Sequence, residues 1–469
     1  MNDHLPNSAV GRTVIGCLGI LAAMAVASSA LFASDETVSL LSSASSPTFS
    51  LSGSFSMRYV YRTAEMTDGR TSDQDAYGDL RVDLVRPRDN RYEFHFQGAV
   101  RSDLDGDQDV TGFYPLEDIG DTWGQPSKAQ LLEANAVLND PVKYAKRITV
   151  GRQSGTRDEP VFFDGAAAEL GSDKLLLTLY GGAAVHFYEV NATWGKDTLE
   201  GAGIDYRPLP SLGLSADALA VQDLREFDPN GGEVRDRMLS FKVWQRFEPF
   251  TRVSAQYRYL NGEARDLSVR AAGAWQEQDA EMNVGYFRQF NPQAELSNEL
   301  SPFTDVIGLS APFQSIDIKL RKSFASRVAF DLGYFLRDLL DQADQGPFNK
   351  EYSRAFIDAE VSDLFIANLS WTVTAERWKS ESTSSDTLGT DLTYRIRKGG
   401  RESRVSAGTF YSLYKYDYYA DLGERDDVRT YYLDGRYPLA KGLSMNGRYE
   451  YEHGIERYQT LRLGMRYDF

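Results

Sequence analysis

The sequence predicts an all-β fold, a closed antiparallel β-barrel that crosses a membrane with about 18 to 22 strands, short periplasmic turns and long extracellular loops. Three observations predict it. Long segments alternate between apolar and polar residues, the polar positions carry many charges, and the single cysteine lies in an N-terminal apolar segment. No stretch of about 18 apolar residues follows that segment, so the sequence predicts no membrane-spanning helix.

The N-terminus has the features of a secretory signal peptide. After Arg12 an apolar run extends from Val14 to Ala27, and small residues follow it. The run is shorter than the roughly 20 residues that a membrane-spanning helix needs, which leaves an N-terminal anchor as the weaker alternative. We expect residues 1–33 to form the signal peptide, 34–47 a polar leader, and 48–469 the barrel.

The only cysteine, Cys17, falls within this signal segment. The mature chain is therefore expected to be exported, yet to have no disulfide framework, thiol nucleophile or thiolate metal site. Removal of residues 1–33 deletes one charge of each sign, Asp3 and Arg12, so the mature chain keeps the net charge of −17. This acidic balance argues against nucleic acid as a partner.

The first predicted strand, Phe49 to Arg62, has one apolar and one polar face. Its odd-numbered positions read Phe, Leu, Gly, Phe, Met, Tyr and Tyr, and its even-numbered positions read Ser, Ser, Ser, Ser, Arg, Val and Arg. A strand of a soluble sandwich also alternates in this way. Strands in globular proteins average about five or six residues, however, and this run exceeds the roughly nine to eleven that a tilted strand needs to cross a bilayer.

The same alternation recurs along the chain, and its polar face is charged. Residues 91–100 and 252–260 show it, as do segments throughout the C-terminal half, where Arg448 and Glu450 share one face. Ions at this density would not be packed dry inside a soluble protein. The apolar face is therefore expected outside, which requires lipid as the outer solvent and a sheet without an open edge.

Short and long connections alternate between the predicted strands, as periplasmic turns and extracellular loops do in outer-membrane barrels. The expected short connections lie at 87–90, 171–174, 207–211, 247–249, 322–327, 362–365, 397–403 and 436–442, and the long ones include 63–75, 103–127, 221–236 and 291–314. The pattern predicts about 22 strands, or 18 to 20 if the weak segments between residues 129 and 221 merge.

The C-terminal segment is the sharpest strand prediction. Residues 460–469 alternate fully, with Tyr467 and Phe469 on the apolar face. A terminal aromatic residue that closes such a strand resembles the C-terminal signature of Gram-negative outer-membrane barrel proteins, which their assembly machinery reads. The resemblance implies location in the outer membrane of a Gram-negative bacterium, with outer-membrane lipid and the barrel-assembly machinery as partners.

A second resemblance lies between Lys146 and Leu170. This segment looks like the "GRQ … FDG" region of porins of the alginate-export type, with the match at Gly151, Arg152, Gln153, Phe163, Asp164 and Gly165. The resemblance implies an outer-membrane barrel of about 18 strands with an arginine-rich lumen suited to a polyanionic sugar. Here the inward positions mix arginine with acid, and TRDEPV replaces the usual glycine-rich link. Both departures argue against alginate as the cargo.

A wide barrel leaves an aqueous channel, and fixed charges on its wall select solutes by sign and size. The alternative is that these charges pair across strands and stiffen the wall. The expected pore-lining cations are Arg58, Arg62, Arg81, Arg101, Arg252, Arg258, Arg395, Arg448 and Arg462, and the expected anions are Asp83, Glu93, Glu376, Asp391 and Glu450.

An acidic segment follows residue 102. Asp103, Asp105, Asp107 and Asp109 are spaced by two with a glycine among them, which resembles a calcium-binding loop. The spacing is not that of an EF-hand, because Gln108 and Tyr114 replace the glycine and glutamate at positions six and twelve. A solvated acidic loop, or one that folds into the channel as a constriction, is the default interpretation.

The sequence favours transport over catalysis. Outside the signal segment, His95, His186 and His453 stand in unrelated segments without metal-ligand spacing, and no CxxCH motif for covalent haem is present. We expect a porin with a charged aqueous channel for small or anionic hydrophilic solutes, with no cofactor unless calcium binds the acidic loop. The alternative is a barrel that serves as a sheath around a lumenal or periplasmic protein partner, such as a multihaem cytochrome, which would co-purify as a red protein.

Overall fold

The computed structural model describes residues 49–66, 69–86, 90–105, 127–154, 159, 161–185, 195–224, 232–247, 251–293, 296, 310–325, 327–346, 349–380, 383–411, 429–454 and 457–469. The expected signal peptide (1–33) and leader (34–47) lie outside the described residues. Leu51–Val85 and Asn90–Phe469 belong to one compact unit, while a second set of residues, 1–50 and 86–89, is grouped apart from it.

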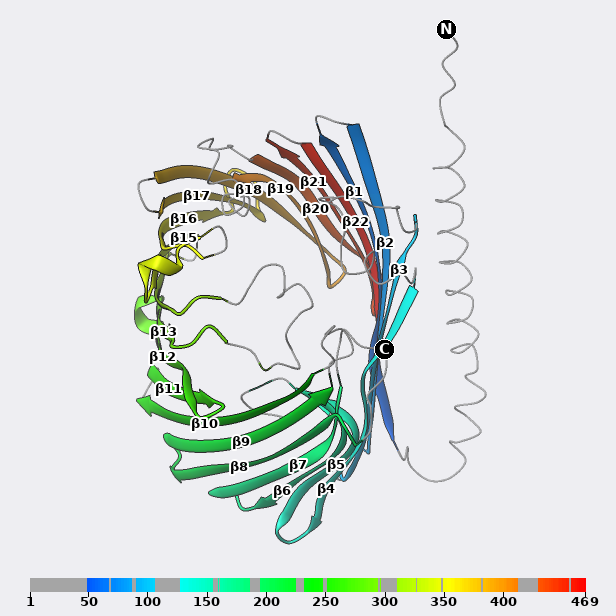
Figure 1. Ribbon diagram of the computed structural model, residues 1–469. Helices are drawn as coiled ribbons and strands as arrows, with labels where there is room; N and C mark the ends of the chain where they lie inside the picture. Colours follow the sequence, from blue (N-terminus) through cyan, green and yellow to red (C-terminus); the bar gives the residue numbers. More distant parts are fainter. Residues whose placement is uncertain are drawn as a thin grey trace, which may run out of the picture. The chain divides into compact units, whose positions relative to one another are not determined.

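The described chain forms a 22-stranded antiparallel sheet in which each strand pairs with its neighbours in sequence (Figure 1). The sheet closes because β1 pairs with β22. The strands are β1 (Ser50–Met66), β2 (Gly69–Val85), β3 (Tyr92–Asp103), β4 (Ser127–Val142), β5 (Ala145–Ser154), β6 (Phe162–Gly171), β7 (Leu175–Val185), β8 (Thr198–Leu209), β9 (Leu212–Leu224), β10 (Glu233–Phe247), β11 (Thr251–Leu260), β12 (Glu263–Trp275), β13 (Ala280–Gln289), β14 (Phe313–Phe324), β15 (Val328–Leu339), β16 (Tyr352–Ser362), β17 (Leu369–Ser380), β18 (Thr383–Lys398), β19 (Arg401–Tyr411), β20 (Arg429–Ala440), β21 (Leu443–His453) and β22 (Arg457–Asp468).

The predicted fold class is confirmed, and the count of about 22 strands is the correct one. The merging of weak segments between residues 129 and 221 does not occur, because β4 to β9 are separate strands. In the described part of the connections there are two short 3-10 turns, η2 (Gln276–Gln278) and η4 (Gln342–Asp344). Among the described residues, no helix has the length and apolar character needed to span a bilayer.

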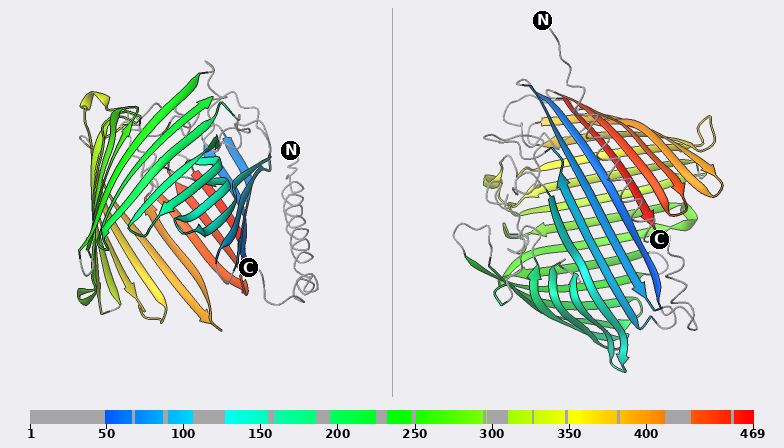
Figure 2. Two further views of the ribbon diagram at one scale, coloured as in Figure 1. Left: turned by 90° about the horizontal axis from the view of Figure 1, so that it is seen from below. Right: turned by 90° about the vertical axis from the view of Figure 1, so that its right-hand side faces the viewer.

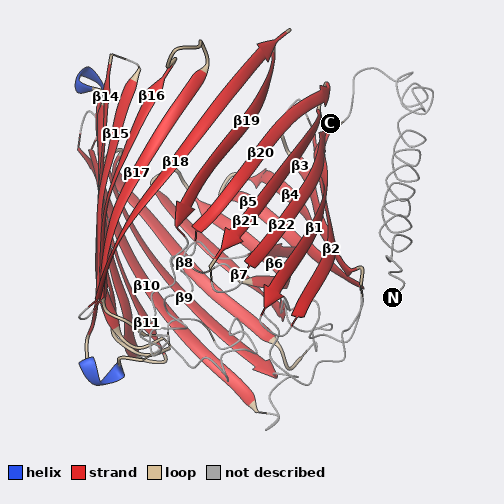
Figure 3. Cartoon of the chain, turned by 90° about the horizontal axis from the view of Figure 1, so that it is seen from above, coloured by secondary structure: helices blue, strands red, loops and turns tan. Residues whose placement is uncertain are grey.

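The strands are inclined to the barrel axis and end at two rims (Figure 2, Figure 3). We call the end that carries the connections 172–174, 399–400 and 441–442 the turn rim, and the opposite end the loop rim. The longest connections, 104–126, 290–312 and 412–428, are all at the loop rim. The predicted asymmetry between turns and loops is therefore present.

The loop predicted at 63–75 is wrong. Strands β1 and β2 continue through most of it, and only residues 67 and 68 separate them. The segment lacks an apolar face because the two strands extend as a polar hairpin, in which Arg62 forms ion pairs with Asp73 (2.9 Å) and Asp75. The connection between β11 and β12 at the loop rim is also short. It consists of Asn261 and Gly262, whose positive φ angles of 54° and 87° suit a tight hairpin turn.

The barrel is apolar outside and polar inside. Large apolar side chains such as Phe96 and Ile318 are 41% and 39% exposed, whereas Asp266 and Gln289 are each 2% exposed. The polar face is the concave one, because Glu159 after β5 contacts Arg258 on β11, a strand that is not its neighbour, at 2.8 Å. Such a contact can run only across the inside of a closed sheet. An exposed apolar belt over a polar interior suits lipid as the outer solvent.

The seam between β1 and β22 predicts a sensitive glycine. Gly53 and Phe469 exchange two backbone hydrogen bonds of 3.0 Å, and a Cβ at Gly53 would overlap the carbonyl oxygen of Arg81 and the ring of Phe469. Gly53→Ala should therefore lower the free energy of unfolding by about 1–3 kcal/mol, because the seam must open to admit the methyl group. Urea unfolding of the refolded barrel in detergent micelles measures this.

The matched control is Gly78→Ala on β2, where an added Cβ meets nothing within 4 Å. It should leave the free energy of unfolding unchanged or slightly higher, because alanine loses less backbone entropy on folding than glycine. Equal stability of the two variants would contradict the packing described for the seam.

Candidate functional site

The strand registers place all the predicted pore-lining residues on the inner face of the barrel. Residues directly opposite each other in neighbouring strands share a face, as in the series Arg62, Thr460, Glu450 and Tyr432 across β1, β22, β21 and β20. The same reasoning applies to Arg58, Arg62, Arg81, Arg101, Arg252, Arg258, Arg395, Arg448, Arg462, Asp83, Glu93, Glu376, Asp391 and Glu450.

Several predicted residues pair with one another. Glu450 accepts from Arg448 and Arg462, each at 2.8 Å. On β2 and β3, Asp83 lies 3.0 Å from Arg81 and 2.7 Å from His95. The pairs Arg462–Glu450 and His95–Asp83 join neighbouring strands and stiffen the wall, and all four pairs use part of the charge that a solute would otherwise meet.

Glu93 shares the same histidine, since it lies 3.2 Å from the His95 ring. Other predicted residues have partners that the sequence did not indicate. Asp391 accepts from Thr393 at 2.8 Å and from the Tyr432 hydroxyl. Glu376 pairs with Arg354 on the neighbouring strand.

Two of the predicted arginines lie over aromatic rings instead of carboxylates. The Arg58 guanidinium is 4.4 Å from the ring centre of Tyr77, and that of Arg252 is 5.2 Å from the ring centre of Trp244. Among the described residues, Arg101 forms no salt bridge. The inner wall thus combines paired and unpaired cations.

An arginine row crosses β18, β19 and β20 near the turn rim. Arg395 lies directly opposite Arg404, and Arg404 lies directly opposite Arg436. Asp434 accepts from Arg404 at 2.7 Å, but Arg395 and Arg436 form no salt bridge with a carboxylate of the described chain. Like charges directly opposite each other repel, so the row favours any anion that comes close to it.

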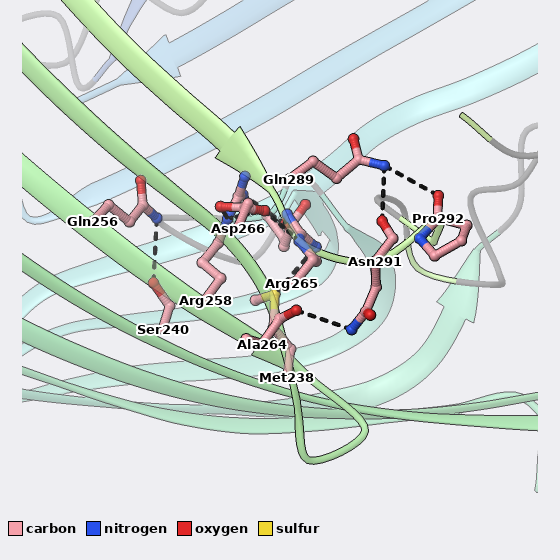
Figure 4. Close-up of polar contacts among 11 residues, drawn as sticks. Met238, Ser240, Gln256, Arg258, Ala264, Arg265, Asp266, Gln289, Asn291 and Pro292 are labelled. Carbon is pink, nitrogen blue, oxygen red and sulfur yellow. Dashed lines mark hydrogen bonds and ion pairs between the residues drawn. The ribbon is translucent and has the colours of Figure 1, made fainter. Parts of the chain in front are cut away.

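An ionic latch fastens Glu159, which follows β5, to strands β11 and β12. The latch consists of Glu159, Arg258, Arg265 and Asp266. Its members on β11 and β12, Arg258, Arg265 and Asp266, are labelled in Figure 4. Arg258 donates to Glu159 and Asp266 at 2.8 Å each, and Arg265 donates to Asp266 at 2.8 Å and to Glu159. A β-bulge opposite Arg258 allows the adjacent Arg265 and Asp266 to face the same side. The two arginines and two carboxylates balance, which permits their burial.

A small apolar core lies beside the latch on the inner wall. It is formed by buried residues of β6 to β11 together with Val161 and Leu296 from two loop-rim connections. Gln289 anchors the second connection, because its amide donates to the carbonyl oxygens of Asn291 (2.9 Å) and Pro292 (3.2 Å) (Figure 4). The same amide donates to the Ser310 carbonyl oxygen at 3.1 Å. Val161 and Leu296 therefore cover part of the inner wall.

The residues of the family resemblance pair directly across β5 and β6. Gly151 lies opposite Gly165, Arg152 opposite Asp164, and Gln153 opposite Phe163. Arg152 holds Asp164 by two hydrogen bonds of 2.6 and 2.7 Å and also donates to the Leu131 carbonyl at 3.0 Å. Because Arg152 alternates with Gln153, which is buried on the inner face, this ion pair lies on the outer face.

Of the predicted calcium ligands, the structure describes Asp103 and Asp105, while Asp107 and Asp109 lie outside the described residues. The Asp105 backbone N–H donates to Asp103 at 3.0 Å, and Asp105 accepts from the Gln74 backbone N–H at 3.0 Å. Within the described ranges, no group of three or more His, Cys, Asp or Glu could hold a metal ion. Partial desolvation, with the Asp103 carboxylate contributing, raises the pKa of Asp105 to about 6.

No protein-family model matches the sequence, and no curated protein matches it. The fold is similar to that of the translocation pore of the P pilus usher PapC, with a TM-score of 0.52 and 10% identity over 88% of this chain and 99% of that chain. At this identity the likeness shows the fold alone.

Two porins are matched more loosely. They are the outer-membrane protein OpdK of Pseudomonas aeruginosa (TM-score 0.42, 12% identity, 90% of this chain and 99% of that one) and a BenF-like porin of Pseudomonas fluorescens (0.44, 10%, 89% and 98%). Likenesses at these scores carry no argument about function. The resemblance to porins of the alginate-export type stays a prediction.

Glu159→Gln tests the latch. After the change, Asp266 is the only carboxylate left in the latch for the two arginines, Arg258 and Arg265. Arg265 is 3% exposed, so a buried positive charge loses its counterpart. We expect the free energy of unfolding to fall by about 3 kcal/mol. The control, Glu233→Gln, breaks an exposed pair with Arg235 (2.8 Å) and should cost less than about 1 kcal/mol. Similar small losses in both variants would contradict a buried latch.

Asp105 predicts a pH dependence of stability. Its pKa in the folded chain is raised above the ordinary value of 3.8 to about 6, so its protonated form is favoured by folding. This contribution is complete below about pH 4 and is lost as the pH rises through about 6. Urea unfolding should show lower stability at pH 7.5 than at pH 5. The difference should shrink in Asp105→Asn, and an unchanged difference in that variant would assign it to another group.

Proposed function

We propose that this chain is an outer-membrane porin, a passive channel for small hydrophilic solutes that favours anions. The arginine row (Arg395, Arg404 and Arg436) is the observation that carries the proposal. Its cations repel one another unless an anion stands near them, and side chains of the row are exposed on the inner wall, Arg404 by 51%. A barrel of 16 or more strands is wide enough for an aqueous channel, and this one has 22.

Several of the other predicted pore-lining residues then act through the field of their ion pairs. Arg448, Arg462 and Glu450 form one such group, in which two cations share one carboxylate. The net positive charge of this group raises the local concentration of anions without binding any of them tightly. Fast passage needs weak binding of this kind, because a tightly held solute blocks the channel.

A sheath around a multihaem cytochrome is the alternative function. It requires an inner surface open to a folded protein. Here Val161 and Leu296 pack onto the inner wall at 0% and 1% exposure, and the latch fixes Glu159 across the interior. An inner wall that these residues of the chain itself already cover favours a solute channel over a sheath.

Reversal potentials in planar bilayers under a potassium chloride gradient test the proposal. The refolded protein should form stable channels with a reversal potential of the sign for anion selectivity. In the triple variant Arg395→Gln, Arg404→Gln, Arg436→Gln, the ratio of chloride to potassium permeability should fall at least about threefold, because the field along that wall is weakened.

The control removes the same net charge from the outer face, in Arg235→Gln, Arg237→Gln, Arg377→Gln. These side chains lie on the same face as the exposed apolar residues Phe241 and Trp371, and Arg377 pairs with Asp386 at 3.7 Å. The control should keep the parental selectivity. Channels without anion preference would overturn the anionic part of the proposal, and a correctly folded barrel that does not conduct would overturn the porin itself.

A further inference from the structure

Aromatic side chains gather on the inner face of β15, β16 and β17, where a channel wall is otherwise polar. Phe335 lies opposite Arg354, and Arg354 lies opposite Trp378, so all three share the inner face. Tyr352 and Phe356 stand two residues on either side of Arg354 and face the same way. We call Phe335, Tyr352, Phe356 and Trp378 the aromatic patch; its strands are labelled in Figure 1.

The rings of the patch lie side by side. Tyr352 and Trp378 are stacked, with ring centres 5.5 Å apart and an interplanar angle of 27°, and Tyr352 lies 5.4 Å from Phe335 at 31°. Near-parallel neighbouring rings form a continuous apolar surface. The patch therefore has the form of a platform.

Charged groups hold this platform and frame it. Arg354 lies 4.8 Å from the ring centre of Phe356 and 5.3 Å from that of Trp378. Glu376 accepts from Arg354 and also from the Trp378 indole N–H at 2.9 Å. The indole, the guanidinium and the carboxylate thus hold one another in place, and the charges of the guanidinium and the carboxylate cancel.

The patch differs from the apolar core on the opposite part of the wall. Core residues such as Phe163 and Leu199 are 0% and 1% exposed, whereas all four rings of the patch are only half-buried. The rings are too exposed to form part of a core, and their apolar faces make no hydrogen bonds with water. They are suited to contact with an apolar surface that a passing solute carries.

We propose that the aromatic patch binds the pyranose rings of a saccharide; this rests on the proposed channel function. The faces of a pyranose ring are lined with C–H groups that stack on aromatic rings, while its hydroxyls are both donors and acceptors. Glu376 supplies an acceptor and Arg354 a donor at the edge of the platform. An aromatic acid suits the patch less well, because its carboxylate would meet Glu376 beside a cation that Glu376 already neutralises.

Titration calorimetry on the refolded full-length barrel in detergent micelles tests the binding directly, with maltohexaose, cellohexaose and chitohexaose as probes. At least one hexasaccharide should bind, and Trp378→Ala and Tyr352→Ala should each raise its dissociation constant about tenfold through the loss of a stacking surface. Trp378→Phe, which keeps a ring, should retain most of the affinity. The gel mobility of each variant before and after heating reports whether the barrel has folded.

Trp371→Ala is the matched control. Trp371 lies on the outer face of the same strand, β17, where its indole N–H donates to Thr390 at 2.7 Å. It should bind the saccharide as the parent does. The inference is overturned if none of the three saccharides binds, if Trp371→Ala weakens binding as much as Trp378→Ala, or if benzoate binds in their place with the same dependence on Trp378.

The same saccharide, added to one side of a planar bilayer, should interrupt the current through the parental channel and should do so much less in Trp378→Ala. A failure of the channel proposal appears as absence of current without any sugar. A failure of the saccharide proposal appears as absence of calorimetric binding to a folded barrel. The two failures are therefore distinguishable.

Discussion

The pairing of β1 with β22 is the constraint on which the rest of the structure depends. A backbone N–H or C=O left unpaired at membrane depth costs several kcal/mol, so a sheet in lipid must have no free edge. The seam runs from Ser54 opposite Asp468 to Glu65 opposite Arg457. Once it is closed, every side chain faces either lipid or the interior, and a shift by one residue would exchange the two faces.

Closure also explains why the latch and the arginine row both lie on the inner wall. The inner wall carries two kinds of charge arrangement. Between β5 and β12 the latch is buried and charge-balanced, and it holds a covering segment against the wall. From β15 to β22 the ion pairs are more exposed, and the arginine row and the aromatic patch lie among them. The first arrangement narrows the interior, and the second presents groups to a solute.

The sequence was informative wherever side chains alternate strictly. The alternation at Phe94, Arg395 and Leu463 was enough to predict both the barrel and the face of each residue, because the period of a strand is two. The polar hairpin after Arg62 has no apolar face, so the same criterion read it as a loop. The alternation of apolar and polar side chains therefore predicts a strand only where one face of that strand contacts lipid.

The latch and the aromatic patch could not be predicted for a different reason. Arg265 and Asp266 are adjacent in sequence, so alternation assigns them to opposite faces, and only the bulge opposite Arg258 brings them together. Glu159 is distant from both in sequence. Tyr352 and Trp378 meet through the register of β16 and β17, which the turn at 363–368 sets and the hydrophobic pattern does not.

Accessibility of spin labels along β18 is the most direct test of the inside-out barrel. The only cysteine of the sequence is Cys17, in the expected signal peptide, so single cysteines from Leu388 to Arg397 can be labelled without background. In liposomes, labels at 388, 392, 394 and 396 should collide with oxygen, which is soluble in lipid. Labels at 389, 391, 393 and 395 should collide with a water-soluble nickel chelate. Equal access of the chelate to both sets, or the reverse assignment, would contradict the account.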